Sequence, residues 1–358
     1  MHARCKLRRR QPHCKPNWIK YAYCPNIYTN KKLIEADGND LIIIKTDEIG
    51  GRIPLEKNIQ ISNNDIFLVG DSFIQADEIT YEETIYGVLN IAHNIKSYGI
   101  GYASWNPIQY AKVIKKIGVT KKDYIVFITS NDVNPSYSRS VYGEMNRIRR
   151  DKLKEKITSI FKFSYFVYKR YKNALPKSMF KEEDGLIMDH NMFSKDEIHN
   201  CKPLKEIDKK IKSKLSYDYL VWSKSIKCWP DKHLIAYEVF ANKVLDLINY
   251  VNKELDSNIY LVFVAPGWPF PGENTVGRIS NEYSFPGNIS ISQKGLVNEI
   301  KKDFGNYFII DTEEIISIDM SKCKPHCKNK YFFPADGHWT AASHRLMSEK
   351  IIEELLLK

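Results

Sequence analysis

Residues 66–73 read Ile66-Phe67-Leu68-Val69-Gly70-Asp71-Ser72-Phe73, in which four apolar residues lead into a Gly-Asp-Ser turn. A short continuous apolar run bounded by a turn is typical of a strand that is buried on both faces of a sheet. The turn then carries the hydroxyl of Ser72 just past the end of that strand. We therefore predict a buried strand that delivers a serine hydroxyl to one edge of the sheet.

Strands of the same kind recur along the chain and alternate with helices. With the first strand at 65–69, apolar runs lie at 124–129, 259–264 and 307–311, and amphipathic helical patterns lie at 80–92, 107–117, 232–255, 291–303 and 340–357. This alternation predicts an α/β fold in which helices cover both faces of a parallel sheet. Functional residues in such sheets lie at the carboxyl ends of the strands. Ser72 and Ser130-Asn131-Asp132 both follow predicted strands, so both are expected at that edge.

The expected domain organisation follows from where this alternation holds. We predict an irregular N-terminal arm with short strands over residues 1–60 and a single α/β domain over residues 61–358. Residues 133–230 interrupt the alternation with a Lys- and Tyr-rich helical stretch and a polar segment. They are predicted to form a mainly helical insertion, which either caps the functional edge or elaborates the surface.

The composition is that of a soluble globular protein, with 43% hydrophobic and 27% charged residues. The formal net charge of +11 fits either a lysine-rich soluble surface, which we favour, or a basic patch for an acidic polysaccharide or membrane surface. No nucleic-acid-binding motif accompanies the charge, so nucleic acid is not expected as a partner. The sequence carries no signal of an oligomeric state.

The sequence also bears on membranes and location. No stretch approaches the roughly 18 consecutive apolar residues of a membrane-spanning helix, and residues 1–20 are basic with no apolar stretch after them. We therefore expect no transmembrane segment and no signal peptide. As written, the chain is expected to be cytoplasmic. A start codon placed after a lost membrane anchor would give the same sequence, which leaves an extracytoplasmic location open.

Residues suited to acyl chemistry occur in a fixed order along the chain. A serine such as Ser72 needs a base to become a nucleophile. His338 is the candidate base, and Asp336 would hold its ring in the required tautomer. The side chain of Asn131 and the backbone of a glycine turn at 98–102 are candidate donors to an oxyanion. Each residue, taken alone, also fits an ordinary cap, turn or loop position, but the ordered set favours the catalytic interpretation.

These segments resemble the four blocks of the SGNH/GDSL hydrolase superfamily. The resemblance covers roughly residues 65–132 and 255–358, and Lys45–Arg52 is similar to the segment that often precedes the first block. It implies a flavodoxin-like three-layer α/β/α sandwich. It also implies that the substrate is a small-molecule or polysaccharide ester and that no metal or organic cofactor takes part.

The resemblance also implies roles for particular residues. Ser72 would be the nucleophile, and His338 with Asp336 would be the base and its orienting group. The oxyanion donors would be the Ser72 amide, a glycine of the second block and the side chain of Asn131. Gly101 fits the glycine position of the second block better than its neighbour at 99 does.

Two departures from the family pattern bear on the reaction. The third block normally reads Gly-x-Asn-Asp, but Thr129 stands in place of the glycine. The last block has one residue between Asp336 and His338 and then Trp339, which resembles the branch found among polysaccharide O-acetyl-modifying proteins. Both hydrolases and acetyltransferases occur in that branch. An esterase is therefore the first expectation, an O-acetyltransferase the second, and an inactive carbohydrate-binding protein the third.

Aromatic residues near this edge are candidates for substrate contacts. The loop at 265–272, which contains Trp268, follows a predicted strand and is therefore expected at the functional edge. It is either a wall on which a sugar stacks or a rigid proline-rich loop packed on its own aromatic side chains. Trp339, next to the candidate base, is the second predicted substrate contact.

The chain has seven cysteines, an odd number, so they cannot all pair within the chain. They lie at positions 5, 14, 24, 201, 228, 323 and 327. Cys323, His326 and Cys327, together with the cysteines near the N-terminus, could in principle supply zinc ligands. Their spacing lacks the paired motifs of zinc sites, so we expect ordinary free thiols and no metal.

Overall fold

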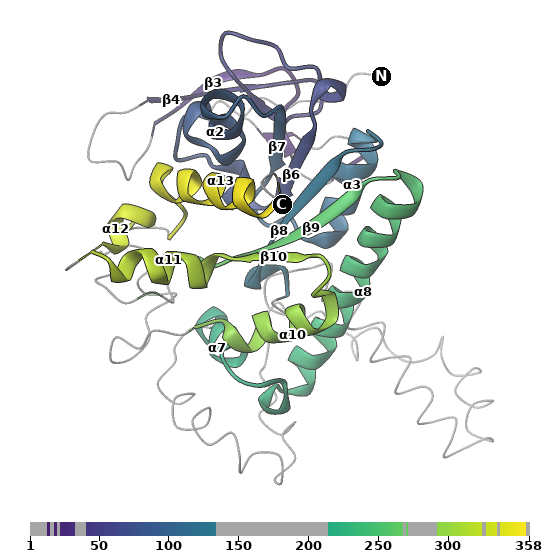
Figure 1. Cartoon of the computed structure of the whole chain (residues 1–358), viewed down its shortest axis with the longest axis vertical. Helices are drawn as coiled ribbons and strands as arrows, with labels where there is room; N and C mark the ends of the chain where they lie inside the picture. The colour runs from purple at the N-terminus through teal and green to yellow at the C-terminus, as the bar shows by residue number, and fades with distance from the viewer. Residues whose placement is uncertain are drawn as a thin grey trace, which may run out of the picture.

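The computed structural model describes residues 13–14, 18–19, 22–32, 41–133, 214–267, 270, 292–323, 327–334 and 337–355 (Figure 1). Most of the predicted insertion at 133–230 lies outside these residues, so its helical content and its role as a cap stay predictions. The limits of the predicted domains likewise stay predictions.

A five-stranded parallel sheet forms the centre of the molecule (Figure 1). Its strands are β6 (Ile66–Gly70), β7 (Ser97–Gly101), β8 (Asp123–Thr129), β9 (Asn258–Val264) and β10 (Phe308–Asp311). They lie side by side in the order β10-β9-β8-β6-β7, and each neighbouring pair is parallel. This is the 2-1-3-4-5 order of flavodoxin-like sheets, so the predicted α/β fold is confirmed.

Helices cover both faces of this sheet. One face packs against α3 (Pro107–Ile117), α7 (Lys214–Trp222), α8 (Asp231–Glu254) and α10 (Lys294–Phe304). The other packs against α2 (Ile85–Ala92), α11 (Thr312–Ser321) and α13 (Ala341–Leu355). Side chains of β6 alternate between the two layers, Phe67 and Val69 to one side and Ile66 and Leu68 to the other. Burying each such side chain contributes about 1.5–3 kcal/mol, which explains why the strand is apolar throughout.

The glycine turn predicted at 98–102 is wrong, because residues 97–101 form strand β7. The glycines there serve close packing. A Cβ at Gly99 would lie 1.9 Å from the ring of Tyr86, and one at Gly101 would lie 2.5 Å from the carbonyl oxygen of Asp71. Glycine inside a strand often marks such a close approach, and here it lets α2 and the chain after β6 press against the sheet.

Local signals define α3, which matches its predicted limits. The side chain of Asn106 accepts a hydrogen bond from the Ile108 amide at 3.0 Å, and Pro107 occupies the first turn. The helix ends at Gly118, whose φ of 63° is left-handed. An Asn cap, an early proline and a terminal glycine are the expected boundaries of a helix. The helix is thereby fixed in register, which places Tyr110 beneath the carboxyl end of β8.

The described part of the N-terminal region contains short antiparallel strands. A hairpin forms from β1 (His13–Cys14) and β2 (Ala22–Tyr23), and a small sheet from β3 (Tyr28–Lys32), β4 (Leu41–Thr46) and β5 (Arg52–Ile53). Asp47 ties the small sheet to the main one. Its carboxylate accepts hydrogen bonds from the amides of residues 49, 50 and 51 at 3.0 Å each and from the Tyr98 hydroxyl on β7 at 2.7 Å.

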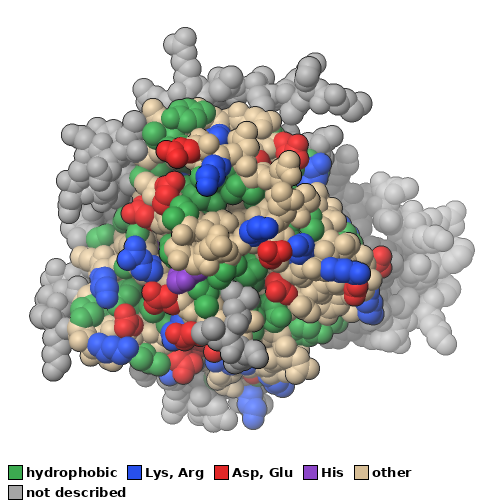
Figure 2. Space-filling view, turned by 45° about the horizontal axis from the view of Figure 1, so that its top comes forward, with side chains coloured by type: hydrophobic (Ala, Val, Ile, Leu, Met, Phe, Trp, Pro, Cys, Tyr) green, Lys and Arg blue, Asp and Glu red, His purple; other side chains and the backbone are tan. Residues whose placement is uncertain are grey.

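One face of the molecule has mixed charge. On the face drawn in Figure 2, Lys and Arg side chains are interspersed with Asp and Glu and do not gather in one patch. Among the described residues, no helix is both long and apolar enough to cross a membrane.

His344 on α13 gives the fold a specific acid sensitivity. Burial, with the charges of Arg52 and His338, lowers the pKa of His344 to about 3. An unfolded chain binds this proton near pH 6.5, so the folded state loses stability as the pH falls from 6.5 towards 3. Relative to His344→Gln, the wild-type free energy of unfolding should fall by about 3 kcal/mol between pH 7 and pH 4 in urea titrations. A difference that does not change with pH would contradict this prediction.

Candidate active site

Ser72 and His338 meet at the carboxyl edge of the sheet. Ser72 is the first residue of α1 (Ser72–Gln75), which follows β6 directly. The Nε2 atom of His338 lies 2.9 Å from Ser72 Oγ, although 266 residues separate the two in sequence. This is hydrogen-bonding distance for a base and the hydroxyl that it deprotonates.

The chain around His338 is held by backbone hydrogen bonds. The Gly337 amide donates to the Phe333 carbonyl at 2.8 Å, and the Phe333 amide donates to the His338 carbonyl at 2.9 Å. Gly337 has a φ of 71°, a conformation that favours glycine. The Gly267 amide also donates to the Gly337 carbonyl at 2.8 Å. The imidazole packs against the ring of Phe73, with centroids 4.9 Å apart. His338 is therefore held by backbone hydrogen bonds around it and by packing against the residue next to Ser72.

Asp336 and Trp268 both lie outside the described residues. The predicted orienting role of Asp336 and the predicted sugar-stacking role of Trp268 therefore stay predictions. The neighbouring Phe270 is buried.

Asn131 reaches the same edge from β8. It lies in the short helix η3 (Ser130–Asp132), directly after the strand. Its Nδ2 atom donates to Asp71 Oδ2 at 3.2 Å, and Asp71 Oδ1 accepts from the Phe73 amide at 3.1 Å. Since β7 and β8 flank β6 on opposite sides, Ser72 and Asn131 lie at the topological switch point where open α/β sheets bind ligands.

A second carboxylate lies beneath Asn131. Asp132 accepts hydrogen bonds from the Thr129 amide at 3.0 Å and from the Tyr110 hydroxyl at 3.1 Å. Burial, and then the nearby Asp71 carboxylate, raise the pKa of Asp132 well above its ordinary value. Burial also raises the pKa of Asp71, against the hydrogen bonds from Phe73 and Asn131. The floor of the site is therefore a buried polar network that fixes the ends of β6 and β8.

Gly101 lies at the end of β7, opposite Gly70 in the register of the sheet. It is next to α1, because a Cβ at this position would also lie 2.7 Å from the Gln75 amide. Its place beside α1 is compatible with the predicted oxyanion role, which stays a prediction.

Trp339 is not a substrate contact in this structure, which corrects the prediction from its place beside His338. Its side chain is 1% exposed, and its Nε1 donates to the Ala265 carbonyl at 3.3 Å. Its ring packs edge-on against Phe73 with centroids 5.3 Å apart. Trp339 therefore belongs to the core beneath the site.

Arg52 supports the site and was not predicted from the sequence. Its guanidinium donates to the carbonyl of Gln75 at 3.2 Å, to that of Ala76, and to that of Ile79 at 2.9 Å. These carbonyls belong to the last residue of α1 and to the turn that follows it. The signal was the Lys45–Arg52 segment, whose resemblance to a family segment gave no role for the arginine.

Asp77 is the second unpredicted residue. It lies in the same turn, and Gln75 Nε2 donates to its carboxylate at 3.3 Å. Burial and the neighbouring Glu78 raise the pKa of Asp77 well above its ordinary value, whereas the charge of His338 lowers it. Asp77 and His338 are thus electrostatically coupled. No sequence pattern links an aspartate five positions after Ser72 to His338.

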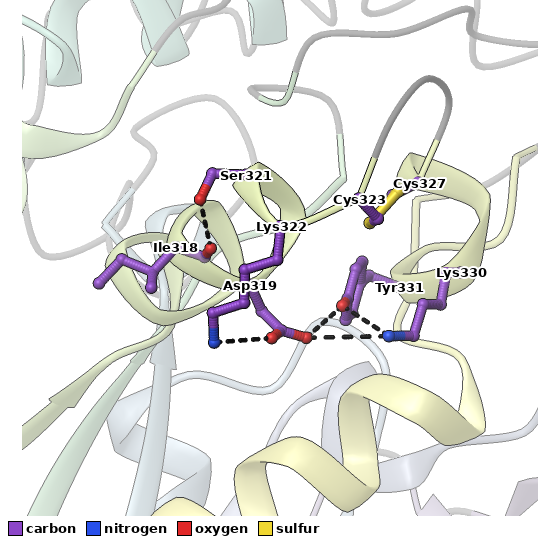
Figure 3. The surroundings of a disulfide bond; sticks show 8 residues. All are labelled: Ile318, Asp319, Ser321, Lys322, Cys323, Cys327, Lys330 and Tyr331. Atoms are coloured by element: carbon purple, nitrogen blue, oxygen red, sulfur yellow. Dashed lines mark hydrogen bonds and ion pairs between the residues drawn. A yellow bond between two sulfur atoms is a disulfide. The ribbon is translucent and has the colours of Figure 1, made fainter.

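The expectation of free thiols is wrong for several cysteines. Cys14 pairs with Cys24, and Cys323 pairs with Cys327. Cys228 is also in a disulfide. Figure 3 shows the second bridge next to Asp319, whose carboxylate lies 3.3 Å from Lys322 Nζ and 3.8 Å from Lys330 Nζ. Disulfide sulfurs are not thiolate ligands, and within the described segments no group of three or more His, Cys, Asp or Glu side chains is arranged to hold a metal.

Comparison with known proteins gives similarity in structure alone. No family model and no curated protein matches the sequence. A member of the lipolytic protein G-D-S-L family from Veillonella parvula has a TM-score of 0.37 and 8% identity, covering 81% of this chain and 97% of its own. The YxiM protein of Bacillus subtilis has a TM-score of 0.40 and 11% identity, covering 89% of this chain and 66% of its own.

Proposed function

We propose that the protein is a serine esterase of the SGNH type that removes O-acyl groups, and specifically O-acetyl groups of a carbohydrate. The observation that carries the proposal is the 2.9 Å contact between His338 Nε2 and Ser72 Oγ at the carboxyl edge of the sheet. The ordered sequence blocks support it, because the same two residues are the predicted nucleophile and base. The O-acetyl specificity rests on the Asp-x-His-Trp resemblance.

The proposed mechanism has two halves. Ser72 Oγ attacks the ester carbonyl while His338 Nε2 takes the hydroxyl proton, and His338 then returns that proton to the leaving alcohol. Water, deprotonated by His338, then attacks the acyl-enzyme and releases the carboxylic acid and free Ser72. The side-chain amide of Asn131 and the backbone N–H groups of Gly101 and Ser72 would stabilise the oxyanion in each half. Asp336 would orient the imidazole.

An O-acetyltransferase would share the first half of this mechanism. A sugar hydroxyl would replace water as the acceptor of the acyl group, and the same residues would serve. The family branch that the last block resembles contains both activities. The measurement that separates them is the fate of the acyl group when an acetyl donor and a glycan acceptor are supplied together: free acetate supports the esterase, and acetylated glycan the transferase.

Labelling with a fluorophosphonate probe tests the acyl-enzyme directly. We expect one equivalent of probe on the peptide that contains Ser72, together with acetate release from aryl acetates and acetylated glycans. Ser72→Ala should lose both. Ser130→Ala is the matched control, since Ser130 is a buried serine beside the site, and it should keep the label. A folded wild-type protein that takes no label would instead support the inactive carbohydrate-binding alternative, and full activity in Ser72→Ala would refute the nucleophile.

The disulfides favour an oxidising compartment as the place of action. Such bonds persist mainly in secreted, periplasmic or cell-surface proteins and are rare in the cytosol. The bonds at Cys14–Cys24 and Cys323–Cys327 therefore favour the extracytoplasmic alternative over the cytoplasmic expectation. An extracytoplasmic location would also give the enzyme access to polysaccharide esters.

A further inference from the structure

Thr129 occupies the position at which the resembled family has glycine, and it lies at the centre of the site. It is the last residue of β8 and is 2% exposed. Its side chain therefore cannot contact solvent or a substrate in the open part of the site. Thr129 can therefore affect the reaction only by acting on the groups that its side chain contacts.

Those groups are the proposed oxyanion donor and the carboxylate next to the nucleophile. Thr129 Oγ1 donates its single proton to Asn131 Oδ1 and lies 3.2 Å from Asp71 Oδ2. Asn131 Nδ2 donates to the same Asp71 oxygen at 3.2 Å. The three side chains form a closed triangle. Asp71 in turn caps α1 through the Phe73 amide, so the triangle joins Asn131 to the helix that carries Ser72.

The triangle determines which way the amide of Asn131 faces. A hydroxyl can donate to the amide oxygen, whereas a carboxylate can only accept from the amide nitrogen. Turning the amide over would place its oxygen against the Asp71 carboxylate, with no proton between them. In the observed orientation one N–H binds Asp71, and the second N–H of the same nitrogen remains for another acceptor. An oxyanion donor must present such a preoriented N–H.

We propose that Thr129 is a positioning residue that holds the Asn131 amide in the orientation required of an oxyanion donor. The proposal rests on the proposed function and goes beyond it, since it assigns a role to a side chain that the family's glycine lacks. Thr129 does not touch the reacting atoms. We expect it to act on the transition state through Asn131.

Three variants at position 129 test this role. Thr129→Val keeps the shape and removes the hydroxyl, and we expect kcat for an aryl acetate to fall about 10- to 100-fold with KM within about twofold, less than the loss on removing a whole donor. Thr129→Ser restores the hydroxyl and should recover kcat to within about threefold of wild type. Thr129→Ala should behave like Thr129→Val, which guards against misfolding of a single variant.

A control and a double variant separate positioning from stability. Thr46 is equally buried and donates its hydroxyl to the Cys24 carbonyl at 2.7 Å, so Thr46→Val should lower the midpoint of thermal unfolding without changing kcat. Combining Thr129→Val with Asn131→Ala should give the kcat of Asn131→Ala alone, because the two residues act as one unit.

The outcomes distinguish this inference from the proposed function. Wild-type kcat in Thr129→Val, or additive losses in the double variant, would overturn the positioning role while Ser72→Ala stays inactive. Full activity in Ser72→Ala would overturn the proposed function and the inference together. Three results together would support the inference. Thr129→Val lowers kcat and leaves KM unchanged, Thr129→Ser keeps the wild-type kcat, and Thr129→Val has no further effect when Asn131→Ala is already present.

Discussion

Replacing His338 with glutamine is expected to lower kcat/KM by about 10⁴-fold or more while the protein stays folded. Ser72 Oγ would lose the base that lies 2.9 Å away, and a serine hydroxyl without a base is a weak nucleophile. His93→Gln is the matched control, because that side chain is exposed at the end of α2. Steady-state kinetics with an aryl acetate and thermal unfolding measure the two effects.

The double variant makes this prediction more demanding. Ser72→Ala and His338→Gln should each cost about as much as both together, since nucleophile and base form one catalytic unit. If the loss of the double variant relative to wild type equals the product of the two single losses, the residues act independently and the proposed mechanism fails. More than a tenth of wild-type activity in His338→Gln would also contradict it.

Replacing Arg52 with methionine is expected to lower the free energy of unfolding by about 3–5 kcal/mol. Arg52 is 3% exposed, and its guanidinium supplies donors to the carbonyls of Gln75, Ala76 and Ile79. Each carbonyl left buried without a donor costs about 1–3 kcal/mol. Urea denaturation gives the value.

Two further variants define this effect. Arg52→Lys keeps the charge but replaces a planar fork of donors by a single ammonium, so its loss should be smaller than that of Arg52→Met. Lys57→Met, at an exposed position of the same region, should change stability by less than about 0.5 kcal/mol. A loss below about 1 kcal/mol in Arg52→Met would show that the turn after α1 does not depend on the guanidinium.

Much of the fold was predictable because its signals are local. The strand at 66–70 is apolar throughout, and α3 carries a cap, an early proline and a terminal glycine. The strand at 97–101 was missed because two glycines in five residues also suit a turn. Their actual cause is the ring of Tyr86 and the chain at Asp71, which are brought there by tertiary packing and leave no local pattern.

The candidate site divides in the same way. Ser72, Asn131 and His338 were expected at one edge because strand ends and motif order place them there, and the structure brings Ser72 and His338 into contact. Trp339 was misassigned because successive residues of an extended chain point to opposite sides, so a neighbour of His338 faces the core. Arg52 acts through backbone carbonyls, which have no sequence signature.

The contact between Ser72 and His338 joins residues 266 positions apart, and this separation has a temporal consequence. A chain folded only as far as β8 would contain the nucleophile and Asn131 but no base, so it could not hydrolyse esters. Contacts between residues so far apart in sequence require the chain to lose loop-closure entropy, and they tend to form late in folding. Under the proposed mechanism, activity would return during refolding only after the segment that carries His338 has docked.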